Sequence, residues 1–91
     1  MNREELESAS QSLRQAAELV SNEEIEKRIY TQSRELAELA MADQEPEQDR
    51  LASQIRTLNE ILRGVTDPDV ISQVEQARNA IETYQEGGSR E

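Results

Sequence analysis

The chain has 91 residues, a length typical of one small domain. It contains neither Cys nor His, which excludes disulfides, the usual zinc and iron–sulfur sites, cysteine nucleophiles and acid–base catalysis by imidazole. With 20 acidic residues against 10 basic ones, the net charge is −10, so we expect the chain to bind neither nucleic acid nor acidic lipid surfaces.

The composition also argues against a membrane protein and indicates a salty environment. No apolar run approaches the roughly 18 residues of a membrane-spanning helix, and no basic segment followed by an apolar run indicates a secretory signal. Lys27 is the single Lys beside nine Arg. A surface rich in carboxylates and poor in Lys suits concentrated salt, in which screening suppresses self-repulsion. We therefore expect a protein of a salt-adapted, halophilic cytoplasm.

The first predicted helix covers residues 3–20. Asn2 followed by Glu5 three residues later resembles a capping box at its start. Its apolar residues recur at alternating spacings of three and four, which is the pattern of one buried helix face. These residues are Leu6, Ala9, Leu13, Ala16 and Val20, with Ala17 beside them.

The apolar stripe changes its phase at Ser21-Asn22. At about 100° per residue, the stripe before this point and the one after it lie on opposite sides of any single straight helix. Ser21 followed by Glu24 also matches a capping box. The sequence therefore predicts a helix end here and a second helix over residues 23–42. Its stripe consists of Ile25, Ile29, Leu36 and Ala40.

A third helix is predicted over residues 46–63, after a connection at residues 43–45. Pro46 suits a first helical position, and Gly64 is expected to end the helix. The buried stripe of this helix is Leu51, Ile55, Leu58, Leu62 and Val65, widened by Ile61.

The fourth helix, over residues 68–85, follows a strong start signal. Asp67 is the expected N-cap, Pro68 the first helical residue, and Asp69 favours the positive end of the helix dipole. Residues 87–91 are expected to form a disordered tail. The stripe of this helix is Val70, Val74, Ala77, Ile81 and Tyr84, flanked by Ile71.

Four helices of similar length with short connections predict an all-α fold. We expect an antiparallel up-down-up-down four-helix bundle in a single domain, residues 1–86. The alternative is a three-helix bundle in which the first two helices are fused into one long helix. No part of the sequence shows a strand pattern.

Two segments, EPEQDRLASQIRTL and VISQVEQARNAIETYQEG, make the chain resemble a family of small acidic helical proteins from haloarchaea, catalogued as a domain of unknown function. The likeness covers mainly residues 45–87, and that family usually has His-Gly where this chain has Gln48-Asp49, so no role of that His is carried over. The resemblance implies a small helical fold and a salt-adapted host, and no activity. It rests on an acid-Pro-acid start before Arg50-Leu51 and on Val74, Ala77, Arg78, Ile81 and Tyr84.

The densest group of carboxylates lies in residues 43–49, DQEPEQD. Asp43, Glu45 and Glu47 match the first three ligand positions of an EF-hand calcium loop. The pattern then fails, because Gln48 replaces the required Gly and Gln54 replaces the closing Glu. We interpret the segment as a helix start, with Glu47 and Asp49 in the first turn. We expect no metal, no cofactor and no catalytic residues.

One group of apolar residues exceeds what a single core face needs. Tyr30, Ala37 and Met41 form a second line on the second helix, and Leu19 of the first helix also lies off its stripe and could join them. One interpretation is a broad core face from which Tyr30 extends its hydroxyl to water. The other is a contact surface for a protein partner or for a homodimer.

The sequence therefore predicts a non-enzymatic, acidic, helical protein–protein interaction module, with an unknown protein partner or a second copy. Two alternatives stay open. One is a small enzyme that uses carboxylates and magnesium. The other is an acidic regulator that binds a basic, nucleic-acid-binding protein.

Overall fold

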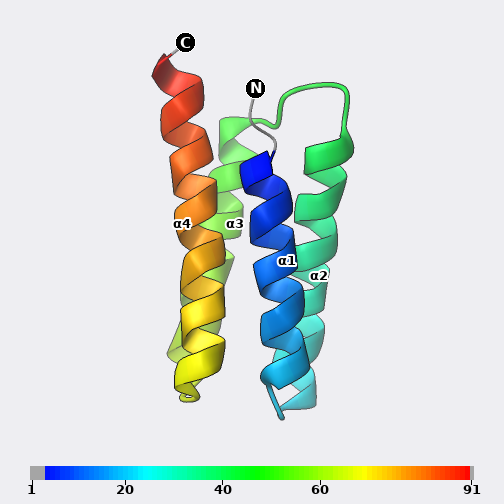
Figure 1. Ribbon diagram of the computed structural model, residues 1–91, viewed down its shortest axis with the longest axis vertical. Coiled ribbons are helices and arrows are strands. Elements are labelled where there is room, and N and C mark those ends of the chain that lie inside the picture. Colours follow the sequence, from blue (N-terminus) through cyan, green and yellow to red (C-terminus); the bar gives the residue numbers. More distant parts are fainter. Residues whose placement is uncertain (1–3, 91) are drawn as a thin grey trace.

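The computed structural model describes residues 4–90, with side chains described as far as Glu86. This part of the chain forms four α-helices and no strand. The helices alternate in direction along the long axis of the bundle (Figure 1). The predicted all-α four-helix fold is confirmed, and the three-helix alternative is wrong. The helices are α1 (Glu4–Leu19), α2 (Glu23–Met41), α3 (Gln48–Arg63) and α4 (Pro68–Arg90).

The break between α1 and α2 is fixed by a side-chain cap. Asn22 has extended backbone angles, φ −81° and ψ 120°. Its Oδ1 accepts hydrogen bonds from the backbone N–H groups of Glu24, at 2.9 Å, and Ile25, at 3.2 Å. The cap is therefore Asn22 and not Ser21, because only the residue directly before the helix places its side chain below the free N–H groups of the first turn. Asn2, the expected cap of α1, lies outside the described residues.

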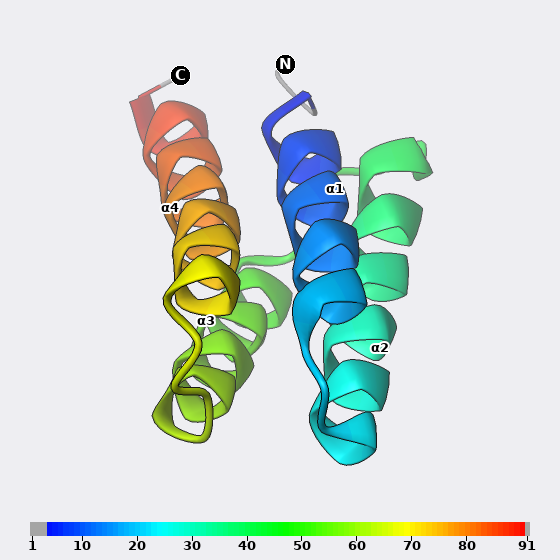
Figure 2. The same ribbon diagram turned by 60° about the horizontal axis from the view of Figure 1, so that its bottom comes forward.

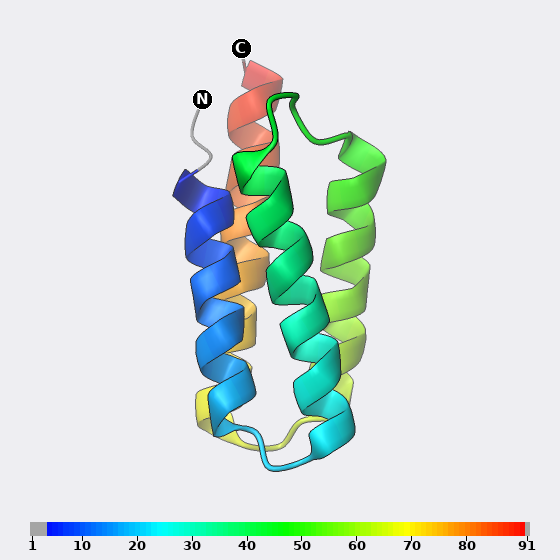
Figure 3. The ribbon, with the colours of Figure 1, turned by 90° about the vertical axis from the view of Figure 1, so that its right-hand side faces the viewer.

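Helix α3 begins two residues later than the sequence predicts. Glu47 occupies the N-cap position, at φ −72° and ψ 145°, without a side-chain cap hydrogen bond. Its carbonyl accepts the N–H groups of Arg50, at 3.0 Å, and Leu51, at 3.2 Å. Pro46 therefore belongs to the connection, residues 42–47. The physical reason is the distance to be crossed, since Figure 3 shows this connection spanning the gap between α2 and α3.

Helix α4 has the expected start and a later end. Asp67 Oδ1 accepts the N–H of Asp69 at 2.9 Å, and the Asp67 carbonyl accepts the N–H of Ile71 at 3.0 Å. The helix then continues to Arg90, beyond its predicted end at residue 85 and through most of the tail that we expected to be disordered. The left-handed glycine cap that is common at helix ends requires a positive φ, and none of the described glycines has one.

The core is built from the predicted stripes. In α3 the buried face turns toward Ile61, which is 2% exposed, while Ile55 and Leu62 are half-buried. The buried apolar residues are Leu6, Ala9, Leu13, Ala16, Ala17, Ile29, Leu36, Ala40, Leu51, Leu58, Ile61, Val65, Val70, Val74, Ala77 and Ile81.

The four helices are not equally spaced. Helix α1 lies between α2 and α4 and packs closely against both (Figure 2). Helix α3 is less closely packed against α4, and of the four neighbouring pairs α2 and α3 approach each other least closely. The side chains explain this, because distance between helix axes depends on the side chains at the contact. Helix α1 buries mainly Ala and Ser besides two Leu, whereas α3 buries Leu, Ile and Gln.

Candidate interaction surface

Three large apolar side chains of the described residues are exposed: Leu19 at 49%, Tyr30 at 36% and Met41 at 76%. All three belong to the group that the sequence singles out, and the fourth member, Ala37, is half-buried. Tyr30 and Met41 are therefore surface residues rather than part of a broad core face. Their role in binding a partner stays a prediction.

A buried serine pair marks the side of α2 that faces α1. The Ser10 hydroxyl donates to the Ser33 carbonyl at 2.9 Å, and the Ser33 hydroxyl donates to the Ser10 carbonyl at 3.0 Å. At about 100° per residue, Tyr30 and Ala37 lie within about 60° of Ser33 around the α2 axis, and Met41 lies within about 80°. We call Tyr30, Ala37 and Met41 the α2 flank. It lies at the outer edge of the contact between α1 and α2.

Leu19 does not belong to the α2 flank. It follows Ser10 by nine residues, which is about two and a half helical turns. Leu19 therefore lies on the opposite side of α1 from Ser10, away from α2 and toward α4. The structure brings three of the four predicted residues together and separates the fourth, because α1 has neighbours on both sides (Figure 2).

The α2 flank is a line rather than a compact patch. At 1.5 Å per residue, Tyr30 and Met41 lie about 16 Å apart along the helix. Two exposed charged residues, Arg34 and Glu38, run beside this line on its edge away from α1. Among the acidic residues of α2, Glu23 and Glu38 are exposed and Glu26 is half-buried.

The opposite side of α2 carries a polar contact with α3 that the sequence analysis does not identify. Gln54, only 4% exposed, donates from Nε2 to Glu35 Oε1 at 2.8 Å. Arg28 and Glu60 form an exposed ion pair at 3.6 Å. The side-chain oxygens of Gln32 and Gln54 are buried without a hydrogen-bond partner in the described protein. The available signal was spacing, since residues 28, 32 and 35 recur on one side of a helix.

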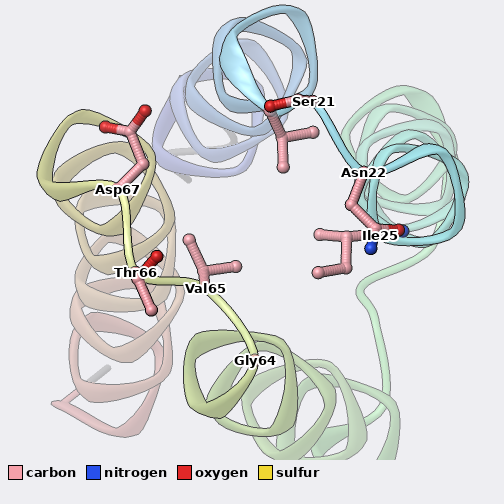
Figure 4. A pocket seen from close by; sticks show the side chains of 8 residues that line it. Ser21, Asn22, Ile25, Gly64, Val65, Thr66 and Asp67 are labelled. Carbon is pink, nitrogen blue, oxygen red and sulfur yellow. The ribbon is translucent and has the colours of Figure 1, made fainter.

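A small pocket of ≈ 170 Å³ opens at the end of the bundle where the α1–α2 and α3–α4 turns meet (Figure 4). Ile25, in the first turn of α2, and Val65, in the connection after α3, point into it. Asn22 and Asp67, on its rim, already accept backbone N–H groups as helix caps. These two side chains therefore serve the helix ends. The lining is Val20, Ser21, Asn22, Ile25, Gly64, Val65, Thr66 and Asp67.

The acidic segment at residues 43–49 is partly connection and partly helix. Asp43, Glu45 and Glu47 are exposed before α3, and Asp49 lies in the first turn of α3. Within residues 4–90 no group of three or more Asp or Glu is arranged to hold a metal ion. Helices of membrane-spanning length and apolarity are likewise absent from this described part.

The comparisons with known proteins identify a family and nothing more specific. No curated protein and no solved structure matches the chain significantly. The model of a family of unknown function, DUF7553, matches residues 1–87. The match includes α1 and α2 as well as the second half, to which the sequence resemblance was mainly confined. The chain therefore belongs to the family of unknown function DUF7553.

Proposed function

We propose that this protein is a non-enzymatic interaction module that binds another protein chain through the α2 flank. The observation that carries the proposal is the alignment of Tyr30 and Met41, both exposed, along one side of one helix. Single exposed apolar residues are ordinary. Two of them in line with a small Ala37 between them offer a partner helix both apolar area and a close approach.

The residue types suit a contact surface. Tyr and Met are enriched at protein interfaces, since Tyr buries a large area and Met adapts its shape to a partner. The exposed Glu23, Arg34 and Glu38 around the line would disfavour partners that do not match their charges. Unlike a catalytic site, such a surface requires no pocket and no group with perturbed chemistry.

A photo-crosslinking amino acid in place of Ala37 tests the proposal in cells that express the full chain. We expect a crosslinked product with a protein, either a second copy or a different chain. Exchanging Tyr30→Ser and Met41→Ser together should abolish this product. The double exchange should lower the free energy of unfolding by less than about 1 kcal/mol, because both residues lie at the surface.

Leu19→Ser is the matched control, since it removes a similarly exposed apolar side chain from the opposite side of α1. The crosslinked product should persist in this variant. Absence of any product in the parent chain would contradict the proposal. A loss of about 2–5 kcal/mol on the double exchange, as expected for Leu58→Ala in the core, would show that the α2 flank is structural.

We also propose that the module works in a salt-adapted cytoplasm, as a haloarchaeal protein would. The net charge of −10 supports this, as do the acidic first turns of the two leading helices: Glu4, Glu5 and Glu7 in α1 and Glu23, Glu24 and Glu26 in α2. Thermal unfolding followed by circular dichroism should show the melting temperature rising between about 0.1 and 2 M KCl, because screening removes most of the repulsion. A flat melting temperature would contradict this setting.

A further inference from the structure

We infer that the partner of the α2 flank is a second copy of this chain, with the two α2 helices antiparallel about a twofold axis. The inference rests on the proposed function and names the partner of that same surface. In a twofold contact the same patch serves both copies, so residue i meets residue j and residue j meets residue i. The α2 flank must therefore be complementary to the same surface of a second copy that runs in the opposite direction.

The apolar residues meet this condition. Tyr30 and Met41 are separated by 11 positions, so their midpoint lies between Glu35 and Leu36. With the axis at this level, Tyr30 of each copy faces Met41 of the other. The two exposed apolar side chains of one copy then cover those of the second copy at both ends of the contact. Ala37, close to the axis, lets the two backbones approach.

The charged residues give the same axis independently. Arg34 and Glu38, both exposed, have their midpoint at residue 36, half a residue from the midpoint of the apolar pair. They lie on the same edge of the α2 flank. The twofold axis of an antiparallel pair lies in the plane of the contact and is perpendicular to the helices, so this edge is on the same side of the contact in both copies. Arg34 of each copy then lies beside Glu38 of the other.

The charges also select the direction. In a parallel twofold pair the edge that carries Arg34 and Glu38 would fall on opposite sides of the contact in the two copies, so neither residue would meet its complement. Only the antiparallel pair places each Arg34 beside Glu38 of the other copy, where the opposite charges attract. The area involved is that of one helix face, so the contact belongs to the weak, transient class rather than to the obligate dimers.

Charge reversal with rescue tests the arrangement. The association of the full chain is measured by sedimentation equilibrium from about 10 µM to about 1 mM, a range suited to a weak contact. Arg34→Glu and Glu38→Arg each create two repulsive pairs across the axis. Each should weaken association roughly tenfold, as expected for two exposed pairs. The double variant carries both exchanges in the same chain and should restore the dissociation constant to within about threefold of the parent, since both pairs become attractive again.

Matched controls separate this effect from net charge and from folding. Arg56→Glu on α3 and Glu75→Arg on α4 make the same charge changes at exposed positions of other helices and should leave association within about threefold of the parent. All variants are compared at one salt concentration at which circular dichroism shows each of them folded.

Two results would overturn the inference. One is a parent chain that stays monomeric over the whole range, and the other is a double variant that associates as poorly as the single ones. Neither result touches the proposed function if the crosslink at position 37 still captures a different protein through Tyr30 and Met41. If the crosslink is absent as well, the proposed function fails with the inference.

Discussion

The two sides of α2 meet their neighbouring helices in different ways. Toward α1, Ser33 exchanges two hydrogen bonds with Ser10, each hydroxyl donating to the carbonyl of the opposite helix. Toward α3, the adjacent residue Gln32 has a buried side-chain oxygen without a partner in the described protein. One residue along the chain thus separates a closely packed, fully bonded contact from a wider, incompletely bonded one.

This difference shows how side-chain size sets the geometry of polar contacts in the bundle. A Ser hydroxyl reaches a backbone carbonyl of another helix only when the two backbones are close, which the small residues of α1 permit. The longer Gln54 reaches Glu35 across the wider contact, but its own oxygen stays unpartnered. A buried polar group without a partner lowers stability. The contact between α2 and α3 is therefore where we expect local opening to begin.

Enlarging a small residue in the closely packed contact between α1 and α2 should have the largest effect on stability. Ala17 is 1% exposed and follows Ser10 by seven residues, so it faces α2. Ala17→Leu should lower the free energy of unfolding by about 1–3 kcal/mol, because a close-packed contact cannot accept the added volume without strain. Urea denaturation measures this. The same exchange at exposed Ala52 of α3 is the control and should change stability by less than about 0.5 kcal/mol.

If Ala17→Leu changed the free energy of unfolding as little as Ala52→Leu does, the α1–α2 contact would have unfilled volume. The explanation of helix spacing by small residues would then be wrong.

Substitutions at the neighbouring residues Ser33 and Gln32 of α2 should change the free energy of unfolding in opposite directions. Ser33→Ala removes one hydrogen bond from the close contact and should lower the free energy of unfolding by about 1 kcal/mol. Gln32→Leu removes an unpartnered buried oxygen from the wide contact and should raise it by about 1 kcal/mol. Urea denaturation of the two single variants checks the sign of each change. A loss of stability in Gln32→Leu would indicate that this oxygen binds an ordered water, which the Leu would displace.

The sequence was sufficient for the fold because helical periodicity is a local signal. The change of stripe phase at Ser21-Asn22 predicts the break between α1 and α2, and Asp67-Pro68 predicts the start of α4. The start of α3 could not be predicted from Pro46, because the length of the connection depends on the distance between α2 and α3. That distance is set by side chains far apart in the sequence.

The candidate surface shows the same limit. The phase of the α2 stripe set Tyr30 and Met41 apart as a second line on the helix, but it left open whether that line belongs to a broad core face or to a contact surface. The stripe of α1 likewise places Leu19 off its own core, but it does not say which helix lies beside that position. Only the Ser10–Ser33 contact shows that Leu19 lies on the side of α1 away from α2.

The smallest expected effect concerns Gly64, at the end of the wide contact. Gly64 ends α3 at φ −101° and ψ 4°, a negative φ that other residues also adopt. A Cβ built there would lie 3.8 Å from the Ile61 carbonyl oxygen and 3.9 Å from Ile25 Cδ1 of α2, which is ordinary van der Waals contact. Gly64→Ala should therefore raise the free energy of unfolding by about 0.4–1 kcal/mol, mainly because Ala restricts the unfolded chain. Chemical denaturation at constant m-value measures the gain. A lower free energy of unfolding would mean that the methyl group added by Gly64→Ala does not fit between α3 and Ile25 of α2 at this end of the bundle.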